Sequence, residues 1–106
     1  MHERIRALND AFRTTFRGGR VMMSAGIASL PGDIRAMILD KVRTFTAFNK
    51  DNDPHGEHDF GIVEASGRRV FWKIDYYDAA CVYGSEDPAD PSQTTRVLTI
   101  FFAHEY

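Results

Sequence analysis

The stretch from Arg69 to Tyr77 constrains the fold most, because its side chains alternate in character residue by residue. The apolar side chains on one parity are Val70, Trp72, Ile74 and Tyr76. Successive side chains of a β-strand point to opposite faces of a sheet. The alternation therefore predicts a strand with one face in the hydrophobic core. A second strand is predicted over Phe60–Glu64, and Ser66-Gly67 between the two is typical of a tight hairpin turn.

Two stretches earlier in the chain repeat apolar residues at steps of three and four, the spacing that lines one side of an α-helix. The first runs from Glu3 to Phe16 and ends at a glycine pair, and the second runs from about Pro31 to Thr46. A short apolar run over Arg20–Gly26 predicts a strand between them. A further strand over Thr94–Ala103 has apolar residues on both parities, as in a central strand.

The predicted order is therefore helix, strand, helix, strand, strand, strand. We expect an α+β fold, with a four-stranded, mainly antiparallel sheet and two helices packed on one face. The 106 residues suffice for a single compact domain with one core, so we assign residues 1–106 to it.

Charge is divided unevenly along the chain. Residues 1–50 hold nine Lys and Arg against four Asp and Glu, whereas residues 51–106 hold four against eleven. This division predicts an acidic face that could steer a charged partner, unless folding interleaves the two halves. Cys81 is the single cysteine, and the longest apolar run is too short to span a bilayer. We therefore expect a cytoplasmic protein with no membrane partner.

The densest cluster of chemically capable side chains lies between Asp51 and Gly61. An EF-hand calcium loop starting at Asp51 fails because Ile62 would occupy the ligand position at the end of the loop. Two imidazoles and nearby carboxylates also suit zinc, iron or manganese. A metal site would use His55, His58 and Asp59, with His104 as a further ligand.

Acid–base chemistry is a related hypothesis, in which Glu57, His58 and Asp59 would serve as catalytic residues of a small metal-assisted hydrolase. The sequence contains no nucleophile elbow, phosphate-binding glycine loop or dinucleotide fingerprint. We favour a non-enzymatic role and expect no cofactor.

The acidic residues of the second half point instead to a binding role. Carboxylates on loops can occupy a basic groove that normally holds nucleic-acid phosphates. Direct nucleic-acid binding is not expected, because the isoelectric point is about 6.0. The predicted partner-binding residues are Asp51, Asp53, Asp75, Asp78, Glu86, Asp87 and Asp90.

Several longer motifs carry a resemblance to a known family. They are Asn52–Gly61, Val70–Asp78, Gly84–Pro91 and Arg96–Ile100. Over nearly its whole length the chain resembles a family of short alphaproteobacterial proteins described as a domain of unknown function (DUF3768). The resemblance implies carriage on plasmids and other mobile elements. It also implies an aromatic residue at the position of His55 in many members, which favours Glu57, His58 and Asp59 as the functional part of the stretch.

These observations lead to one hypothesis and two alternatives. The hypothesis is a small non-enzymatic protein-binding module, acting as a host-defence inhibitor of the anti-CRISPR or anti-restriction type. Its partner would be a CRISPR or restriction complex with a basic surface. The alternatives are the metal-assisted hydrolase and a structural subunit that self-associates through exposed aromatics such as Tyr83 and Tyr106.

Overall fold

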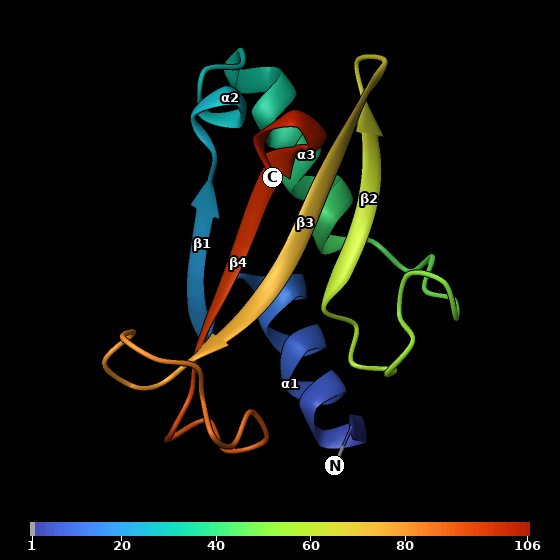
Figure 1. Cartoon of the computed structure of the whole chain (residues 1–106). Helices are drawn as coiled ribbons and strands as arrows, with labels where there is room; N and C mark the ends of the chain where they lie inside the picture. Colours follow the sequence, from blue (N-terminus) through green and yellow to red (C-terminus); the bar gives the residue numbers. More distant parts are fainter. Residues whose placement is uncertain (1) are drawn as a thin grey trace.

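Residues 2–106 are described by a computed structural model, and they form a mixed α+β fold in which helices precede the main hairpin (Figure 1). The elements are α1 (His2–Thr15), β1 (Gly19–Met23), α2 (Ala25–Ala28), α3 (Gly32–Arg43), β2 (Phe60–Ala65), β3 (Arg68–Tyr77), β4 (Thr95–Phe102) and the short 3-10 helix η1 (Ala103–Glu105). Two of the connections between them are long. They are the α3–β2 loop (residues 44–59) and the β3–β4 loop (residues 78–94).

The four strands form one sheet in the order β1-β4-β3-β2. The pairs β2–β3 and β3–β4 are antiparallel, which confirms the mainly antiparallel sheet, and β1 adds to β4 in parallel. Ser66 and Gly67 join β2 to β3 with φ angles of 53° and 75°. Positive φ at both positions matches the right-handed twist of the strands, so this turn fixes the hairpin register.

Helices α1 and α3 lie on the same face of the sheet, behind the strands in Figure 1, as the sequence predicts. Between them and the sheet lies one core, formed by Phe12, Ile27, Ile38, Val42, Val63, Ala65, Val70, Trp72, Ile74, Leu98, Ile100 and Phe102. Trp72 is fully buried at its centre. Burying large apolar side chains is the main favourable contribution to folding.

The expected strand over Arg20–Gly26 is shorter than predicted because a helix begins inside it. Ser24 caps α2, with its Oγ accepting the N–H of Ile27 at 3.2 Å. Glu105 completes the cap by accepting the N–H of Gly26 at 2.9 Å. A carboxylate from the far end of the chain therefore stabilises this helix, and no local pattern predicts that contact.

The opposite sheet face carries only η1 and the last residue within residues 2–106 (Figure 1). A row of rings crosses this face, formed by Phe60, Phe71, Phe101 and Tyr106, with neighbouring centroids 5.7 to 5.8 Å apart. Among residues 2–106, no helix has the length and apolar character needed to cross a membrane.

Candidate functional site

Both acidic loops lie at the end of the sheet where α1 begins (Figure 1). Arg6 Nη1 donates to the carbonyl of Gly56 in the α3–β2 loop at 3.3 Å. Arg4 Nε donates to the carbonyl of Ala89 in the β3–β4 loop at 2.8 Å. Arginines from the basic half of the chain therefore lie between the loops of the acidic half, and the two kinds of charge interleave at this end.

Four of the seven acidic residues predicted to contact a partner use their carboxylates to hold their own loop. They are Asp53, Asp78, Asp87 and Asp90. Asp53 illustrates the role, because its Oδ1 accepts the N–H groups of Glu57 at 3.0 Å and His58 at 3.1 Å. Its side chain is only 6% exposed. Asp53 therefore supports the loop from inside, as Asp side chains commonly do in turns.

The β3–β4 loop is held in the same way. Asp78 Oδ1 accepts the N–H of Val82 at 3.0 Å. Asp90 accepts hydrogen bonds from the hydroxyl and N–H of Ser92 and from the side chain of Gln93, and these bonds lower the pKa of Asp90. The loop backbone is thereby ordered in spite of its two prolines and its length.

The remaining three predicted residues have different surroundings. Asp75 lies on the sheet face away from the helices, where its Oδ2 is 3.1 Å from Lys73 Nζ. Asp51 and Glu86 are exposed, and within residues 2–106 their carboxylates make no hydrogen bond or ion pair. The structure therefore gathers most of the seven at one end but leaves two carboxylates wholly available.

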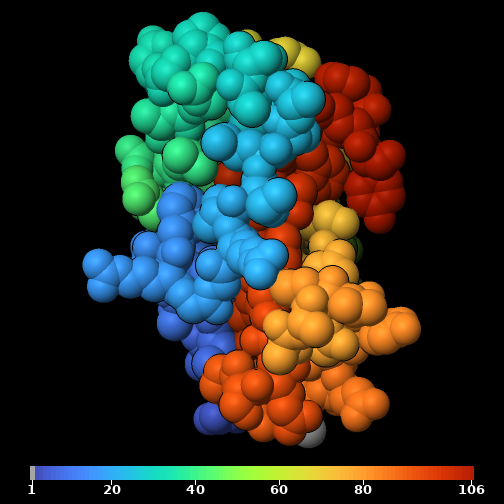
Figure 2. All heavy atoms as spheres, turned by 90° about the vertical axis from the view of Figure 1, so that its left-hand side faces the viewer, coloured from blue at the N-terminus to red at the C-terminus, as the bar shows by residue number. Residues whose placement is uncertain are grey.

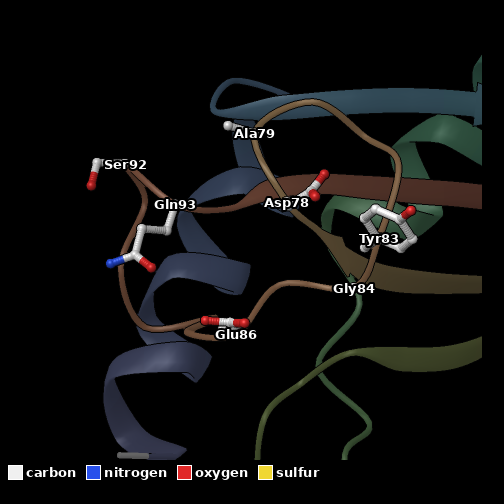
Figure 3. A pocket seen from close by; sticks show the side chains of 7 residues that line it. All are labelled: Asp78, Ala79, Tyr83, Gly84, Glu86, Ser92 and Gln93. Carbon is white, nitrogen blue, oxygen red and sulfur yellow. The ribbon is translucent and has the colours of Figure 1, made fainter.

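The β3–β4 loop encloses a hollow of about 430 Å³ (Figure 3). Its lining residues are Asp78, Ala79, Tyr83, Gly84, Glu86, Ser92 and Gln93. Tyr83 is 74% exposed beside it, and the neighbouring Val82 is 63% exposed. A ring next to carboxylates attracts a cation through both its π-face and the nearby charges. The hollow is therefore suited to an ammonium or guanidinium group.

The Glu57-His58-Asp59 triplet lies in the α3–β2 loop, where its three residues contact different parts of the fold. Glu57 Oε1 accepts the hydroxyl of Tyr76 at 2.9 Å, and its Oε2 is 2.9 Å from Nδ1 of His2. Asp59 is half-buried, and this burial together with the charge of Glu57 raises the pKa of Asp59. Its carbonyl accepts the N–H of Ile74 at 2.8 Å. Asp59 therefore fixes the point at which the loop enters the sheet.

His58 contacts α1 rather than its neighbours in the triplet. Its Nδ1 is 2.9 and 3.1 Å from the two carboxylate oxygens of Asp10. Its ring stacks on Phe48, with centroids 3.7 Å apart and planes 2° apart. The backbone φ of His58 is 55°, a region that residues other than glycine rarely adopt. These contacts pin the loop against the first helix.

The predicted metal ligands are dispersed. His55 is exposed, with its ring 6.1 Å from that of His2. His104 belongs to η1 and stacks on Phe102. Within residues 2–106, no three His, Cys, Asp or Glu side chains form a group that could hold a metal ion. The site of His55, His58 and Asp59 stays a prediction, which the response of thermal stability to added metal ions tests.

A buried polar network, which is absent from the predictions above, lies beneath these loops. Arg96 Nε donates to Asn9 Oδ1 at 2.7 Å. Asn9 Nδ2 in turn donates to the Tyr76 hydroxyl at 2.8 Å and to the carbonyl of Glu57 at 3.0 Å. Burial lowers the pKa of Arg96 and raises that of Tyr76. The network joins α1, β3, β4 and the α3–β2 loop.

One sequence signal could have identified this network. Asn9 lies on the apolar stripe of the first helix, four residues after Ile5 and three before Phe12, and all three are buried. A polar residue at such a position needs a hydrogen-bond partner in the core.

Arg13 of α1 is a second buried polar residue of this helix, because it is only 3% exposed. Its guanidinium carbon lies 5.3 Å from the ring centroids of both Phe48 and Trp72. Burial lowers the pKa of Arg13. Its Nη2 is 3.2 Å from Asp10 Oδ1, whereas its buried Nε and Nη1 have no hydrogen-bond partner among residues 2–106. One ion pair and two cation–π contacts therefore offset only part of the cost of its burial.

The fold and site together define a small two-layer α+β domain whose acidic loops meet around the start of its first helix. The chain belongs to the family described as "Protein of unknown function (DUF3768)", whose model matches residues 23–105. The matched range begins at the last residue of β1, so α1 lies outside it although α1 supplies Asn9 and Asp10. No curated protein and no solved structure matches the chain.

Proposed function

We propose that the protein is a small, cytoplasmic, non-enzymatic protein-binding module, carried on a mobile genetic element, that inhibits a host-defence complex. The observation that carries this proposal is the β3–β4 loop, where Glu86, whose carboxylate is unpaired within residues 2–106, and the exposed Tyr83 line the same hollow. No Lys or Arg occurs between Ile74 and Thr95. The charged side chains that the β3–β4 loop itself contributes around Tyr83 are therefore all negative.

The chemistry of this loop suits a basic surface. A protein that holds DNA or RNA presents Lys and Arg to the phosphates, and an ordered set of carboxylates can compete for the same cations. One Lys or Arg side chain of the partner would enter the hollow between Tyr83, Asp78 and Glu86. Aromatic anchors in such positions commonly provide much of the binding energy.

The internal hydrogen bonds of the loop support the proposal because they reduce the entropy lost on binding. Thr94 Oγ1 donates to the carbonyl of Asp87 at 2.8 Å, and the Ser85 hydroxyl is 2.7 Å from that of Thr94. The carboxylates that cap the loop thus preorganise it. Glu86 and Tyr83 are the groups that we assign to contact with the partner.

We assign the partner to the CRISPR or restriction class, because such complexes hold nucleic acid in positively charged channels. The resemblance implies that the family is carried on mobile elements. Such an element would benefit from an inhibitor of the host defence. The carboxylates of Asp51 and Glu86 would contact the basic rim of the channel.

Affinity capture from a host lysate, with mass spectrometry of the bound proteins, tests the proposal. The wild-type protein should retain a partner with a basic nucleic-acid-binding surface. Binding should weaken as the salt concentration rises, because the screening length falls to about 3 Å at 1 M salt. The same partner should lose nucleic acid when the protein is added.

The decisive variant is Glu86→Lys, and its matched control is Asp33→Lys in the first turn of α3. Both substitutions change the net charge equally, but only Glu86 lines the hollow. Loss of the partner with Glu86→Lys alone supports the proposal. Capture that is insensitive to salt and to Glu86→Lys would refute the electrostatic mechanism.

A further inference from the structure

The edge strand β1 has backbone N–H and C=O groups that form no hydrogen bond within residues 2–106. In a parallel ladder each residue directs both its N–H and its C=O to one side, and alternate residues face the same neighbour. Ser24 N–H donates to the Ile100 carbonyl at 2.9 Å, so Met22 and Arg20 also face β4. The N–H and C=O groups of Val21 and Met23 therefore point away from the sheet.

The other edge of the sheet is guarded. Lys41 Nζ, from α3, donates to the carbonyl of Glu64 in β2. The carboxylate of Glu64 is 3.9 Å from Arg69, so charges surround the end of that strand. Lysines and charges of this kind hinder pairing with another strand.

β1 has no comparable protection within the part of the chain that the structure describes. Its sequence, Gly-Arg-Val-Met-Met, contains no proline or lysine. Met22 is 52% exposed and Met23 is 40% exposed. Figure 2 looks onto this edge and shows the light-blue atoms of β1 facing outward between the helices above and the orange loop below. Arg20 is the one charged residue of this strand, and an edge strand with so little protection is a template for adding another strand.

We propose that β1 pairs antiparallel with β1 of a second copy of the chain, about a two-fold axis at Val21. This register uses the outward groups of Gly19, Val21 and Met23 in both copies, giving one continuous sheet. It places Arg20 of each copy beside Met22 of the other. An axis at Arg20 would instead oppose two like charges, which destabilises a sheet.

We assign the partner strand to a second copy of the chain, because β1 matches itself in this register. The outward backbone groups of one copy meet the same groups of the other. A two-fold interface uses the same surface on both copies. The exposed Met22 side chains then pack beside the aliphatic part of Arg20 on the neighbouring strand. Since only five residues per strand pair, the interface lies at the small end of the range for specific contacts. The dimer should therefore be weak and concentration-dependent.

Hydrogen exchange followed by NMR tests the backbone prediction directly. In dilute protein the Val21 and Met23 amides should exchange rapidly, whereas Met22, bonded to β4, should exchange slowly. Raising the concentration from about 10 μM to about 1 mM, a range that brackets a weak interface, should protect Val21 and Met23. Sedimentation equilibrium over the same range should show a dimer. Monomer mass throughout, or unchanged exchange of Val21 and Met23, would overturn the proposal.

Two substitutions at one exposed residue test the register. Met22→Glu should tighten the dimer about fivefold, because the new carboxylate faces Arg20 of the other copy. Met22→Lys should weaken the dimer about fivefold, because it places two positive charges side by side. Each pair occurs twice in the dimer, once on each side of the two-fold axis. Met37→Lys, at a methionine of α3 that is 36% exposed, should leave dimerisation unchanged. If both Met22 variants weaken association equally, contact is merely apolar and the register is wrong. A dimer equally sensitive to Met37→Lys would show that β1 is not its interface.

Discussion

Arg96 on β4 donates its Nε hydrogen to Oδ1 of Asn9 on α1 over 2.7 Å, and both residues are buried. The contact joins the first helix to the last strand across 87 positions of sequence. Through Tyr76 and Glu57 it continues to the α3–β2 loop. One amide therefore determines how the helix, the sheet and an acidic loop fit together.

Replacing Asn9 with Ala should destabilise the protein by about 2–4 kcal/mol, because several buried polar groups lose their partner at once. Urea unfolding followed by circular dichroism measures this loss. Tyr76→Phe should cost less, since it removes a single hydroxyl. In the double variant the two losses should not add, because both residues belong to one network. Simple additivity would show that Asn9 and Tyr76 act independently.

The sequence predicts the elements of this fold much better than their long-range contacts. Alternation over Val70–Tyr76 identifies the buried face of β3, because residue parity is a local property. No local property states that β1 lies parallel to β4, or that Glu105 caps α2. Those contacts depend on where distant segments meet.

The candidate site shows the same limit. Composition identifies the acidic loops, but Asp53 and Glu86 look alike in the sequence. The first is a buried cap and the second is exposed, and only the path of the backbone distinguishes them. The burial of Arg13 is another feature that the local sequence does not reveal. Its position between two aromatic rings requires Phe48, from the α3–β2 loop, to fold onto α1.

Gly61 is a position where a single methyl group should be costly. A Cβ there would lie 2.5 Å from Nε1 of Trp72, inside the core. Gly61→Ala should therefore lower the free energy of unfolding by about 1–3 kcal/mol, as overpacking does. Gly32→Ala is the control, because the nearest atom to its Cβ is Nη2 of the flexible Arg35 at 3.6 Å. It should be neutral or slightly stabilising in the same denaturation experiment.

Asp59 should make stability depend on pH in a definite direction. Its pKa is raised in the folded protein by burial and by Glu57, so the folded state binds the proton more tightly than the unfolded chain. The stabilising contribution is therefore present in acid and is lost as the pH rises through the folded pKa. Asp59→Asn should be more stable than wild type at pH 7, and this advantage should shrink towards pH 3.

Paired denaturation curves at several pH values measure that difference. Glu86→Gln serves as the control, because Glu86 is exposed and its carboxylate makes no hydrogen bond or ion pair within residues 2–106. A difference between Asp59→Asn and wild type that is constant with pH would show that packing, and not ionisation, sets the effect.

Tyr83 should matter for binding and not for folding. Its ring is 74% exposed, so Tyr83→Ala should change stability by less than about 0.5 kcal/mol. Affinity for the captured partner should fall at least about tenfold, since exposed aromatics at binding surfaces are frequent hot spots. Tyr106→Ala is a matched control, because Tyr106 is 92% exposed and lies away from the hollow. Equal loss from both variants would mean that the β3–β4 loop is not the binding surface.

The hydrolase alternative requires the α3–β2 loop to bind a metal ion. A metal ion that binds only the folded state must stabilise that state. At a ligand concentration 100 times Kd this stabilisation is about 2.7 kcal/mol. The side chains of Glu57 and His58 have separate partners, and no three His, Cys, Asp or Glu side chains in residues 2–106 form a group that could hold a metal ion. We therefore expect zinc, manganese or calcium to leave the thermal midpoint unchanged. Thermal unfolding with each ion, and in EDTA, measures this. A rise that Glu57→Gln and Asp59→Asn abolish, while Asp33→Asn does not, would establish a metal site and favour the hydrolase over the binding module.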